Sequence, residues 1–126
     1  MTESKKKLLL LIEDNPLLTG MYKAAFEQAD YEVVFAHDGA SGLKLAEDKL
    51  PVLILLDLLM PGMDGLTVLE QLKKNSATSN IKVIILTVIN KEESKKKAKE
   101  LGATDFLIKS ELKLSEIVDK VIFHLK

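Results

Sequence analysis

The chain has 126 residues, of which 47% are hydrophobic and 29% charged, and its formal net charge is −1. A chain of this length forms one domain with a sizeable core, and a charge near zero excludes a global attraction to nucleic acids or membrane surfaces. Without cysteine, the chain has no disulfide, catalytic thiolate or cysteine metal site.

The first residues combine three lysines with the apolar run Leu8–Ile12. This pairing is similar to a signal peptide, but the run stops at Glu13 without a small-residue cleavage site. No apolar run approaches the roughly 20 residues that cross a bilayer. We therefore expect a cytoplasmic protein without membrane insertion, with one domain over residues 1–126 and a flexible N-terminal lead over residues 1–7.

Runs of leucine, isoleucine and valine predict five strands. They cover about 8–13, 31–36, 52–57, 81–87 and 104–109. The run before Asp57 is continuously apolar, which is typical of a strand buried on both faces of a parallel sheet. Pro61, Gly62 and Gly65 then direct the chain into a turn.

Helical signals follow each strand. Asn15 is the expected N-cap of the first helix and Pro16 its first residue, and an apolar stripe that includes Leu17 and Met21 follows. The second helix opens at Asp38. Later helices show the same apolar spacing: Leu66, Leu69 and Leu72 in the third, and Leu114, Ile117, Val118, Val121, Ile122 and Leu125 in the last.

The fourth helix is predicted to begin at a capping box formed by Asn90 and Glu93 and to end at Gly102. Between residues 91 and 101, only Ala98 and Leu101 are apolar. A helix with so few apolar residues buries little surface, so we expect it to be held weakly.

The order of these elements, βαβαβαβαβα, predicts an α/β fold with a parallel sheet and helices on both faces. Right-handed crossovers favour a flavodoxin-like (βα)5 sheet of order 2-1-3-4-5. In this order the first and third strands are neighbours. The crevice beyond their carboxyl ends is the expected ligand site.

Polar side chains stand at the ends of the first, third, fourth and fifth predicted strands. They are Glu13, Asp14, Asp57, Thr87 and Lys109. Clustered carboxylates repel one another, and a hard divalent cation such as Mg²⁺ relieves that repulsion with oxygen ligands. All 18 basic residues are lysines, so any cation beside a phosphoryl group there is a metal or a lysine. The set therefore predicts phosphoryl chemistry at Asp57.

Four sequence segments carry a family resemblance. The run Asp57–Gly65 has the pattern Asp-x-x-Met-Pro-x-Met-Asp-Gly, and Leu11–Asn15, Thr87 and Phe106–Lys109 occur in the matching order. In these segments the chain resembles the receiver domain of two-component response regulators, over essentially its whole length.

The resemblance implies that Asp57 accepts a phosphoryl group from a histidine kinase or a phosphotransfer histidine. It implies that Asp14, Asp57 and the backbone carbonyl of Leu59 bind Mg²⁺ or Mn²⁺, and that Glu13 contributes through water. Such a protein is not an enzyme for a separate substrate. It catalyses only its own phosphorylation and its slow dephosphorylation.

The resemblance also assigns a phosphoryl contact to Lys109 and switching movements to Thr87 and Phe106, although Phe106 replaces a frequent tyrosine. Val88 stands where a small residue is usual, and we expect it to restrict access to the phosphate. Ser110 stands where proline commonly follows a cis peptide bond. A cis bond before a non-proline residue costs about 2.5–4 kcal/mol, so we expect a trans or differently shaped loop.

Three alternatives compete with this interpretation. A phosphatase of the haloacid dehalogenase type has a second aspartate two residues after its nucleophile, where this chain has Leu59. A small flavin-binding protein has a phosphate loop after its first strand, where this chain has the acidic Glu13-Asp14. A receiver that docks partners independently of phosphorylation stays open.

Because the chain stops just after its last helix, we expect output through protein contacts, without direct binding of nucleic acid. The expected surface is the fourth helix, fifth strand and fifth helix. The expected partners are a histidine kinase or phosphotransfer protein and a downstream protein of unknown identity. A stand-alone regulator is favoured over a receiver from a larger hybrid kinase or transcription regulator, and a monomer and a weak phosphorylation-linked dimer fit equally.

Overall fold

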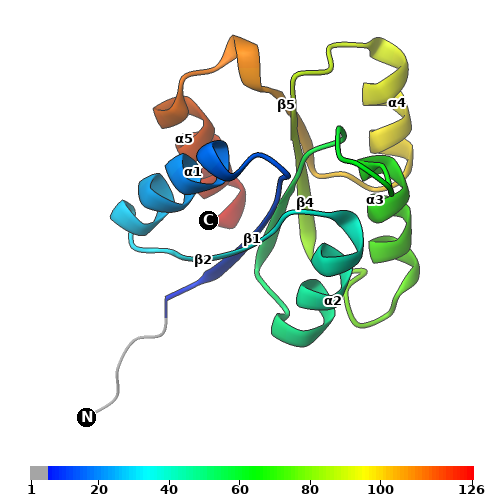
Figure 1. The fold of residues 1–126 in the computed structure, drawn as a ribbon, viewed down its shortest axis with the longest axis horizontal. Helices are drawn as coiled ribbons and strands as arrows, with labels where there is room; N and C mark the ends of the chain where they lie inside the picture. Colours follow the sequence, from blue (N-terminus) through cyan, green and yellow to red (C-terminus); the bar gives the residue numbers. More distant parts are fainter. Residues whose placement is uncertain (1–5) are drawn as a thin grey trace.

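The computed structural model describes residues 6–126, in which a five-stranded sheet lies between two layers of helices (Figure 1). The strands are β1 (Leu8–Ile12), β2 (Glu32–Ala36), β3 (Leu53–Leu56), β4 (Lys82–Thr87) and β5 (Asp105–Ile108). The helices are α1 (Pro16–Gln28), α2 (Gly39–Lys49), α3 (Gly65–Lys74), α4 (Glu92–Glu100) and α5 (Leu114–Leu125).

All paired strands are parallel, in the order β2-β1-β3-β4-β5. This order confirms the predicted flavodoxin-like fold. It also puts β1 beside β3, so the ends of these two strands meet at the switch point of the sheet. Among residues 6–126, no helix is both long enough and apolar enough to cross a membrane.

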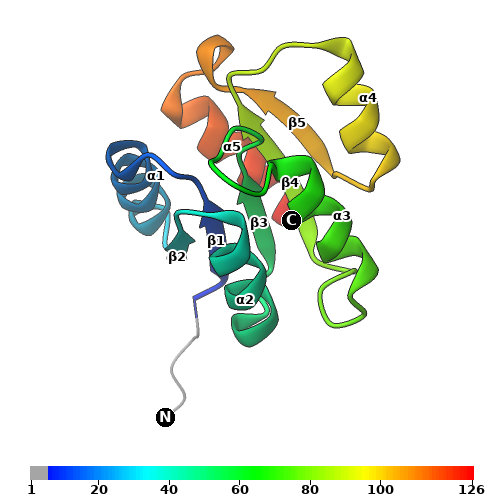
Figure 2. The same cartoon turned by 45° about the vertical axis from the view of Figure 1, so that its right-hand side comes forward.

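The sheet separates two cores, because successive side chains of a strand point to opposite faces. Leu9 and Leu11 belong to the core with α1 and α5, whereas Leu10 and Ile12 belong to the core with the other three helices. Figure 2 shows these two groups of helices on opposite faces of the sheet. The α1–α5 core receives Tyr22, Phe26, Ile117 and Val121 from its helices. The α2–α4 core receives Ala46, Val68, Leu69, Leu72 and Ala98.

Helix α1 begins as predicted. The Asn15 side chain accepts hydrogen bonds from the backbone N–H groups of Leu17 and Leu18 at 3.0 and 3.2 Å, and Pro16 is the first helical residue. The predicted apolar stripe is narrower in the structure, since Leu17 and Met21 are exposed. Only the part of α1 that faces the sheet and α5 is covered by other elements.

The predicted capping box at α4 is wrong. The N-cap is Lys91, which makes no side-chain cap hydrogen bond. The Asn90 amide instead donates a hydrogen bond of 3.1 Å to Glu111, in the turn that follows β5. Ala98 is the one buried side chain of α4, which agrees with the weak anchoring predicted for this helix.

The predicted N-terminal lead covers residues 1–7, and residues 1–5 lie outside the described part of the chain. Lys7 joins the sheet, because its carbonyl accepts a hydrogen bond of 2.9 Å from the backbone N–H of Glu32. The ordered sheet thus begins one residue before β1.

Candidate functional site

The sheet itself fixes the two buried acids of the site. Beyond the ends of β1 and β3, the backbone N–H of Glu13 donates to Ala36 at 3.0 Å, and that of Asp57 donates to Ile12 at 3.0 Å. The parallel hydrogen-bond pattern therefore continues one residue past each strand. Glu13 and Asp57 are held by the main chain at the same edge of the sheet.

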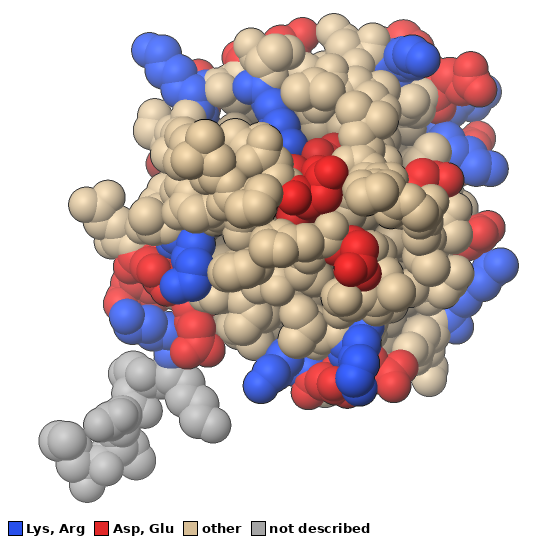
Figure 3. All heavy atoms as spheres, viewed as in Figure 1, with Lys and Arg blue, Asp and Glu red and all other residues tan. Residues whose placement is uncertain are grey.

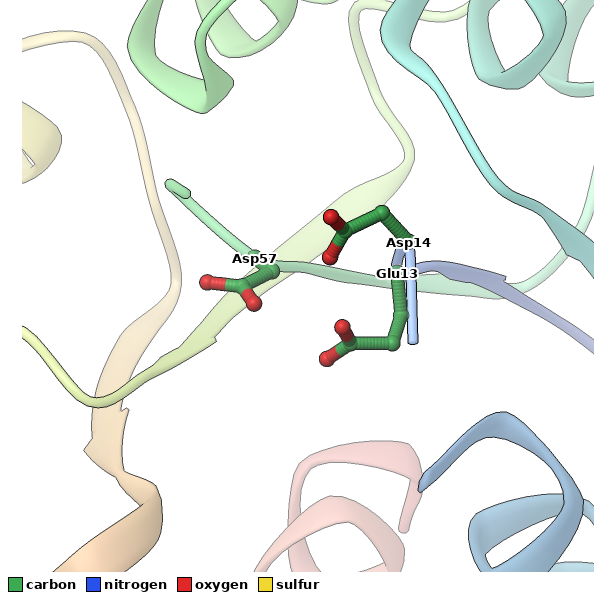
Figure 4. A group of neighbouring side chains, drawn as sticks. All are labelled: Glu13, Asp14 and Asp57. Atoms are coloured by element: carbon green, nitrogen blue, oxygen red, sulfur yellow. The ribbon is translucent and has the colours of Figure 1, made fainter. Parts of the chain in front are cut away.

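Three carboxylates meet at this edge. One oxygen each from Glu13, Asp14 and Asp57 lie within 4.8 Å of one another, and Figure 4 shows the three side chains around a common space. Glu13 and Asp57 are only 2% and 6% exposed, whereas Asp14 is exposed. Figure 3 shows acidic atoms in the middle of this face, with a lysine beside them and uncharged atoms around most of their border. The predicted acidic site is thus assembled in the structure.

One ammonium group serves two of these carboxylates. The Nζ of Lys109 donates a hydrogen bond of 2.9 Å to Asp57 Oδ2 and another to Glu13 Oε1. Burial lowers the pKa of Lys109, but the hydrogen bonds and charges of both acids outweigh it and raise the pKa above its usual value. Lys109 therefore carries a positive charge at neutral pH.

The charge of Lys109 does not fully compensate the charges of the three acids. Burial raises the pKa of Glu13 above its usual value, although hydrogen bonds from Lys109 and from the Asn15 N–H oppose this shift. The negative charge of Asp57 adds to the rise. With three carboxylates and one ammonium group, the cluster keeps excess negative charge when all are ionised.

The carboxylate of Asp57 is oriented from two sides. Its Oδ1 accepts a hydrogen bond of 3.1 Å from the backbone N–H of Leu59, and its Oδ2 accepts the bond from Lys109. The loop behind it is closed by a hydrogen bond of 3.1 Å from the Gly65 N–H to the Leu58 carbonyl. Asp57 is therefore presented in one orientation by a short, tied loop.

Thr87 and Phe106 are placed differently from the charged residues. The Thr87 hydroxyl is buried and accepts a weak hydrogen bond of 3.4 Å from the Ile89 N–H. Among residues 6–126, it makes no hydrogen bond with Asp57 or Lys109. Phe106 is partly buried against the α2–α4 core. The structure thus brings Glu13, Asp14, Asp57 and Lys109 together, and leaves the two predicted switch residues outside that contact set.

The structure also describes two of the positions that depart from the family pattern. No peptide bond within residues 6–126 is cis, so the Lys109–Ser110 bond is trans, as the absence of proline suggested. Both residues belong to a 3-10 turn over Lys109–Glu111. Val88 is 54% exposed and directly follows Thr87, so it is open to an approaching molecule.

The contact between Lys109 and Glu13 was not predicted. Strands β3 and β4 lie between β1 and β5, so sequence position alone gives no reason to pair these residues. The contact could have been inferred by combining the strand order with the length of a lysine side chain, which can reach from the end of β5 to the end of β1. Tyr22 was not predicted as a site residue, and it lies in the α1–α5 core.

Comparison with known proteins identifies the family of the chain and agrees with the fold. Residues 9–122 match the response regulator receiver domain family. The chain therefore belongs to the response regulator receiver domains, the phosphoryl-accepting signalling domains of two-component systems. Such domains interact with phosphodonor kinases and downstream targets, and they typically bind a divalent metal.

The chain is also similar in sequence to individual proteins. Protein PilH of Pseudomonas aeruginosa is 39% identical over 103 residues, which cover 80% of this chain and 84% of PilH. The chain spans 42% of the length of one other curated relative and 22% of another.

Two solved structures share the fold. A CheY-like receiver domain protein of Methanospirillum hungatei has a TM-score of 0.89 at 25% identity and covers 96% of this chain and 94% of its own. The Mn²⁺-bound form of response regulator Rcp1 has a TM-score of 0.78 at 28% identity, with coverage of 91% and 88%.

Proposed function

We propose that Asp57 is the phosphoacceptor of this receiver domain and takes its phosphoryl group from a histidine kinase or a phosphotransfer histidine in the cytoplasm. The observation that carries the proposal is the fixed Asp57 carboxylate, bound by the Leu59 N–H on one oxygen and by Lys109 on the other. An oriented, buried acid beside a cation is prepared for nucleophilic attack on an electrophile that carries negative charge.

The donor set also fits Mg²⁺ or Mn²⁺. Three carboxylates with oxygens within 4.8 Å of one another supply the hard oxygen ligands that these ions prefer. We assign direct binding to Asp14, Asp57 and the Leu59 carbonyl, and binding through water to Glu13. A bound cation would stabilise the charge on the transferred phosphoryl oxygens. The Mn²⁺-bound form of its structural relative Rcp1 supports this assignment.

In the transfer step, Asp57 is the nucleophile and Lys109 stabilises charge. A carboxylate oxygen of Asp57 forms the new bond to phosphorus while the bond between phosphorus and the donor nitrogen or oxygen breaks, with the electron pair leaving on the donor. Lys109 turns towards the phosphoryl oxygens and neutralises part of their charge. Thr87 follows the phosphoryl group, and this movement gives Phe106 room to turn inward.

Hydrolysis of the acyl phosphate should be slow. A general acid–base two residues after the nucleophile would assist water, but this position holds Leu59, an exposed apolar residue. The protein therefore acts on itself and not on a separate substrate. Its phosphorylated state lasts long enough to serve as a signal.

The output surface is proposed to be α4, β5 and α5. Helix α4 buries only Ala98, and a hollow of about 260 Å³ is lined by residues of α4 and β5, among them Phe106. A weakly held helix beside a hollow can be repositioned at low cost. A downstream protein that binds one position of α4 better than the other would receive the signal.

The proposal is tested by incubating the protein with acetyl phosphate and Mg²⁺ and measuring the intact mass. We expect a mass gain of one phosphoryl group that is lost at alkaline pH, as an acyl phosphate requires, and that is absent when EDTA replaces Mg²⁺. A protein that gains no mass under these conditions would contradict the proposed function.

Lys109→Ala should bind Mg²⁺ more tightly and accept phosphate more slowly. The substitution removes the Lys109 ammonium group, which bonds Glu13 and Asp57. The loss of a unit positive charge within hydrogen-bond distance of these two carboxylates should change the Mg²⁺ affinity by at least about tenfold. Calorimetric titration with Mg²⁺ measures the first effect, and the acetyl phosphate assay the second. Lys96→Ala, on the exposed side of α4, is the control that should change neither. Weaker Mg²⁺ binding in Lys109→Ala would contradict the assignment.

Val88→Ala should phosphorylate and dephosphorylate severalfold faster than the wild type. Val88 is 54% exposed beside Thr87, and a smaller side chain widens the approach for donor and water. Val52→Ala is the matched control, because Val52 is also exposed but precedes β3 at the opposite edge of the sheet. The rates come from a time course of the mass assay. Rates equal to or below those of the wild type would exclude a gating role for Val88.

A further inference from the structure

The charged residues of the site lie on the same face of the sheet as the α1–α5 core. Because side chains alternate along a strand, Glu13 lies on the same face as Leu11, and Asp57 on the same face as Leu55. Leu11 and Leu55 belong to the α1–α5 core. The same relation holds for Lys109 and the core residue Leu107 on β5. The three bonded charges therefore lie on the same face of the sheet as this core, beyond its last apolar residues on β1, β3 and β5.

Tyr22 brings a hydroxyl group into the buried part of that core. It is 5% exposed and packs with Phe26 of the next helical turn. Helical side chains lean towards the N-terminus of their helix, and the N-terminus of α1 adjoins Glu13 through Asn15. The Tyr22 ring therefore leans towards the charged cluster.

The Tyr22 hydroxyl has unused hydrogen-bonding capacity. Within residues 6–126, it makes no hydrogen bond, and no fully enclosed side-chain nitrogen or oxygen lacks a partner. The Tyr22 hydroxyl is therefore not fully enclosed. Burial raises the pKa of Tyr22, Lys109 lowers it, and Glu13 and Asp57 raise it further. The hydroxyl thus lies within the field of the three charged residues and stays protonated, as a donor.

A donor is needed there when the site is phosphorylated. In the structure, Glu13 Oε2 accepts the Asn15 N–H at 3.1 Å and Oε1 accepts Lys109. If Lys109 turns to the phosphoryl oxygens, Oε1 loses this donor and keeps only the water that would link Glu13 to the metal. A carboxylate oxygen can accept two hydrogen bonds, and the loss of a donor to a buried charge is costly. Tyr22, whose O–H bonds no residue within 6–126, belongs to the core on the same face of the sheet.

We propose that Tyr22 is a positioning residue for phosphoryl transfer, whose hydroxyl donates to the Glu13 carboxylate when Lys109 leaves it for the phosphoryl group. The proposal rests on the proposed roles of Asp57 and Lys109. The Tyr22 hydroxyl then makes a hydrogen bond in the phosphorylated state and none in the resting state. This difference separates positioning from simple packing.

The test is the affinity for beryllofluoride, an inorganic mimic of the phosphoryl group, at saturating Mg²⁺, together with the urea midpoint of the unliganded protein. Tyr22→Phe keeps the ring and removes only the hydroxyl. We expect it to bind beryllofluoride about tenfold more weakly, as the loss of a hydrogen bond to a charged group predicts, with an unchanged urea midpoint. Tyr31→Phe, the only other tyrosine position in the chain, should match the wild type in both.

Tyr22→Leu distinguishes the two roles further. If Tyr22 only packs, Tyr22→Phe should bind beryllofluoride as tightly as the wild type, and Tyr22→Leu should bind it more weakly. If the Tyr22 hydroxyl positions Glu13, both variants should bind beryllofluoride more weakly. Wild-type affinity in Tyr22→Phe would overturn the inference and leave the proposed function standing. A wild-type protein that binds no beryllofluoride would overturn the phosphoacceptor proposal itself.

Discussion

Asp57→Asn should accept no phosphoryl group from acetyl phosphate, while the wild type becomes phosphorylated. The amide has nearly the shape of the carboxylate but lacks its nucleophilic charge. The fold should survive, because the substitution removes one of three mutually repelling carboxylates and leaves Lys109 bound to Glu13. We expect the free energy of unfolding to equal or exceed that of the wild type. Intact mass and urea denaturation measure the two effects.

Asp64→Asn is the matched control for this substitution. Asp64 belongs to the same loop and caps α3, with Oδ1 accepting the Thr67 N–H at 3.0 Å. Asparagine caps a helix about as well as aspartate, so this variant should fold normally and still accept a phosphoryl group from acetyl phosphate. Equal phosphorylation of Asp57→Asn and the wild type would show that another residue is the acceptor.

Gly65→Ala should damage both stability and phosphorylation. A Cβ at this position would lie 2.4 Å from the Asp57 carbonyl oxygen and 2.5 Å from the Leu58 Cα, and both are backbone atoms that cannot turn away. The loop must shift, which also strains the hydrogen bond from the Gly65 N–H to Leu58. We expect a loss of about 1–3 kcal/mol or more, the range for overpacking, and at least severalfold slower phosphorylation because Asp57 moves with the loop.

Gly20→Ala is the control variant, and we expect it to raise the stability of the protein where Gly65→Ala lowers it. Gly20 lies within α1 and is exposed, and a Cβ added there would have no atom outside its own helix turn within 4 Å. Alanine there should stabilise the protein by up to about 1 kcal/mol, the difference in helix propensity, and leave phosphorylation unchanged. Urea denaturation and the acetyl phosphate time course compare the two variants. A Gly65→Ala variant as stable and as active as Gly20→Ala would contradict the tight contact behind Asp57.

The fold and the acid cluster were predictable because both follow from periodicity. Apolar runs alternating with helical segments define a parallel sheet, and parallel strands bring their carboxyl ends to one edge. Glu13, Asp14 and Asp57 end neighbouring strands, so their meeting requires only the strand order. This part of the site depends on the main chain, which the sequence pattern specifies well.

The features that escaped prediction depend on contacts between distant residues. Asn90 has the sequence of a helix cap, but Glu111 offers its amide another partner. Leu17 and Met21 have the spacing of a buried stripe, yet no other element covers them. The bond from Lys109 to Glu13 crosses two strands through a flexible side chain. Local propensity contains no information about any of these partners.

The sharing of one ammonium group between Glu13 and Asp57 has a thermodynamic consequence. Any ligand that changes the position of Lys109 alters the environment of both acids, so Mg²⁺ and the phosphoryl group cannot bind independently. Linkage requires reciprocity: the factor by which Mg²⁺ changes the affinity for beryllofluoride must equal the factor by which beryllofluoride changes the affinity for Mg²⁺. The concentration of free Mg²⁺ would then set how strongly the domain retains its phosphorylated conformation.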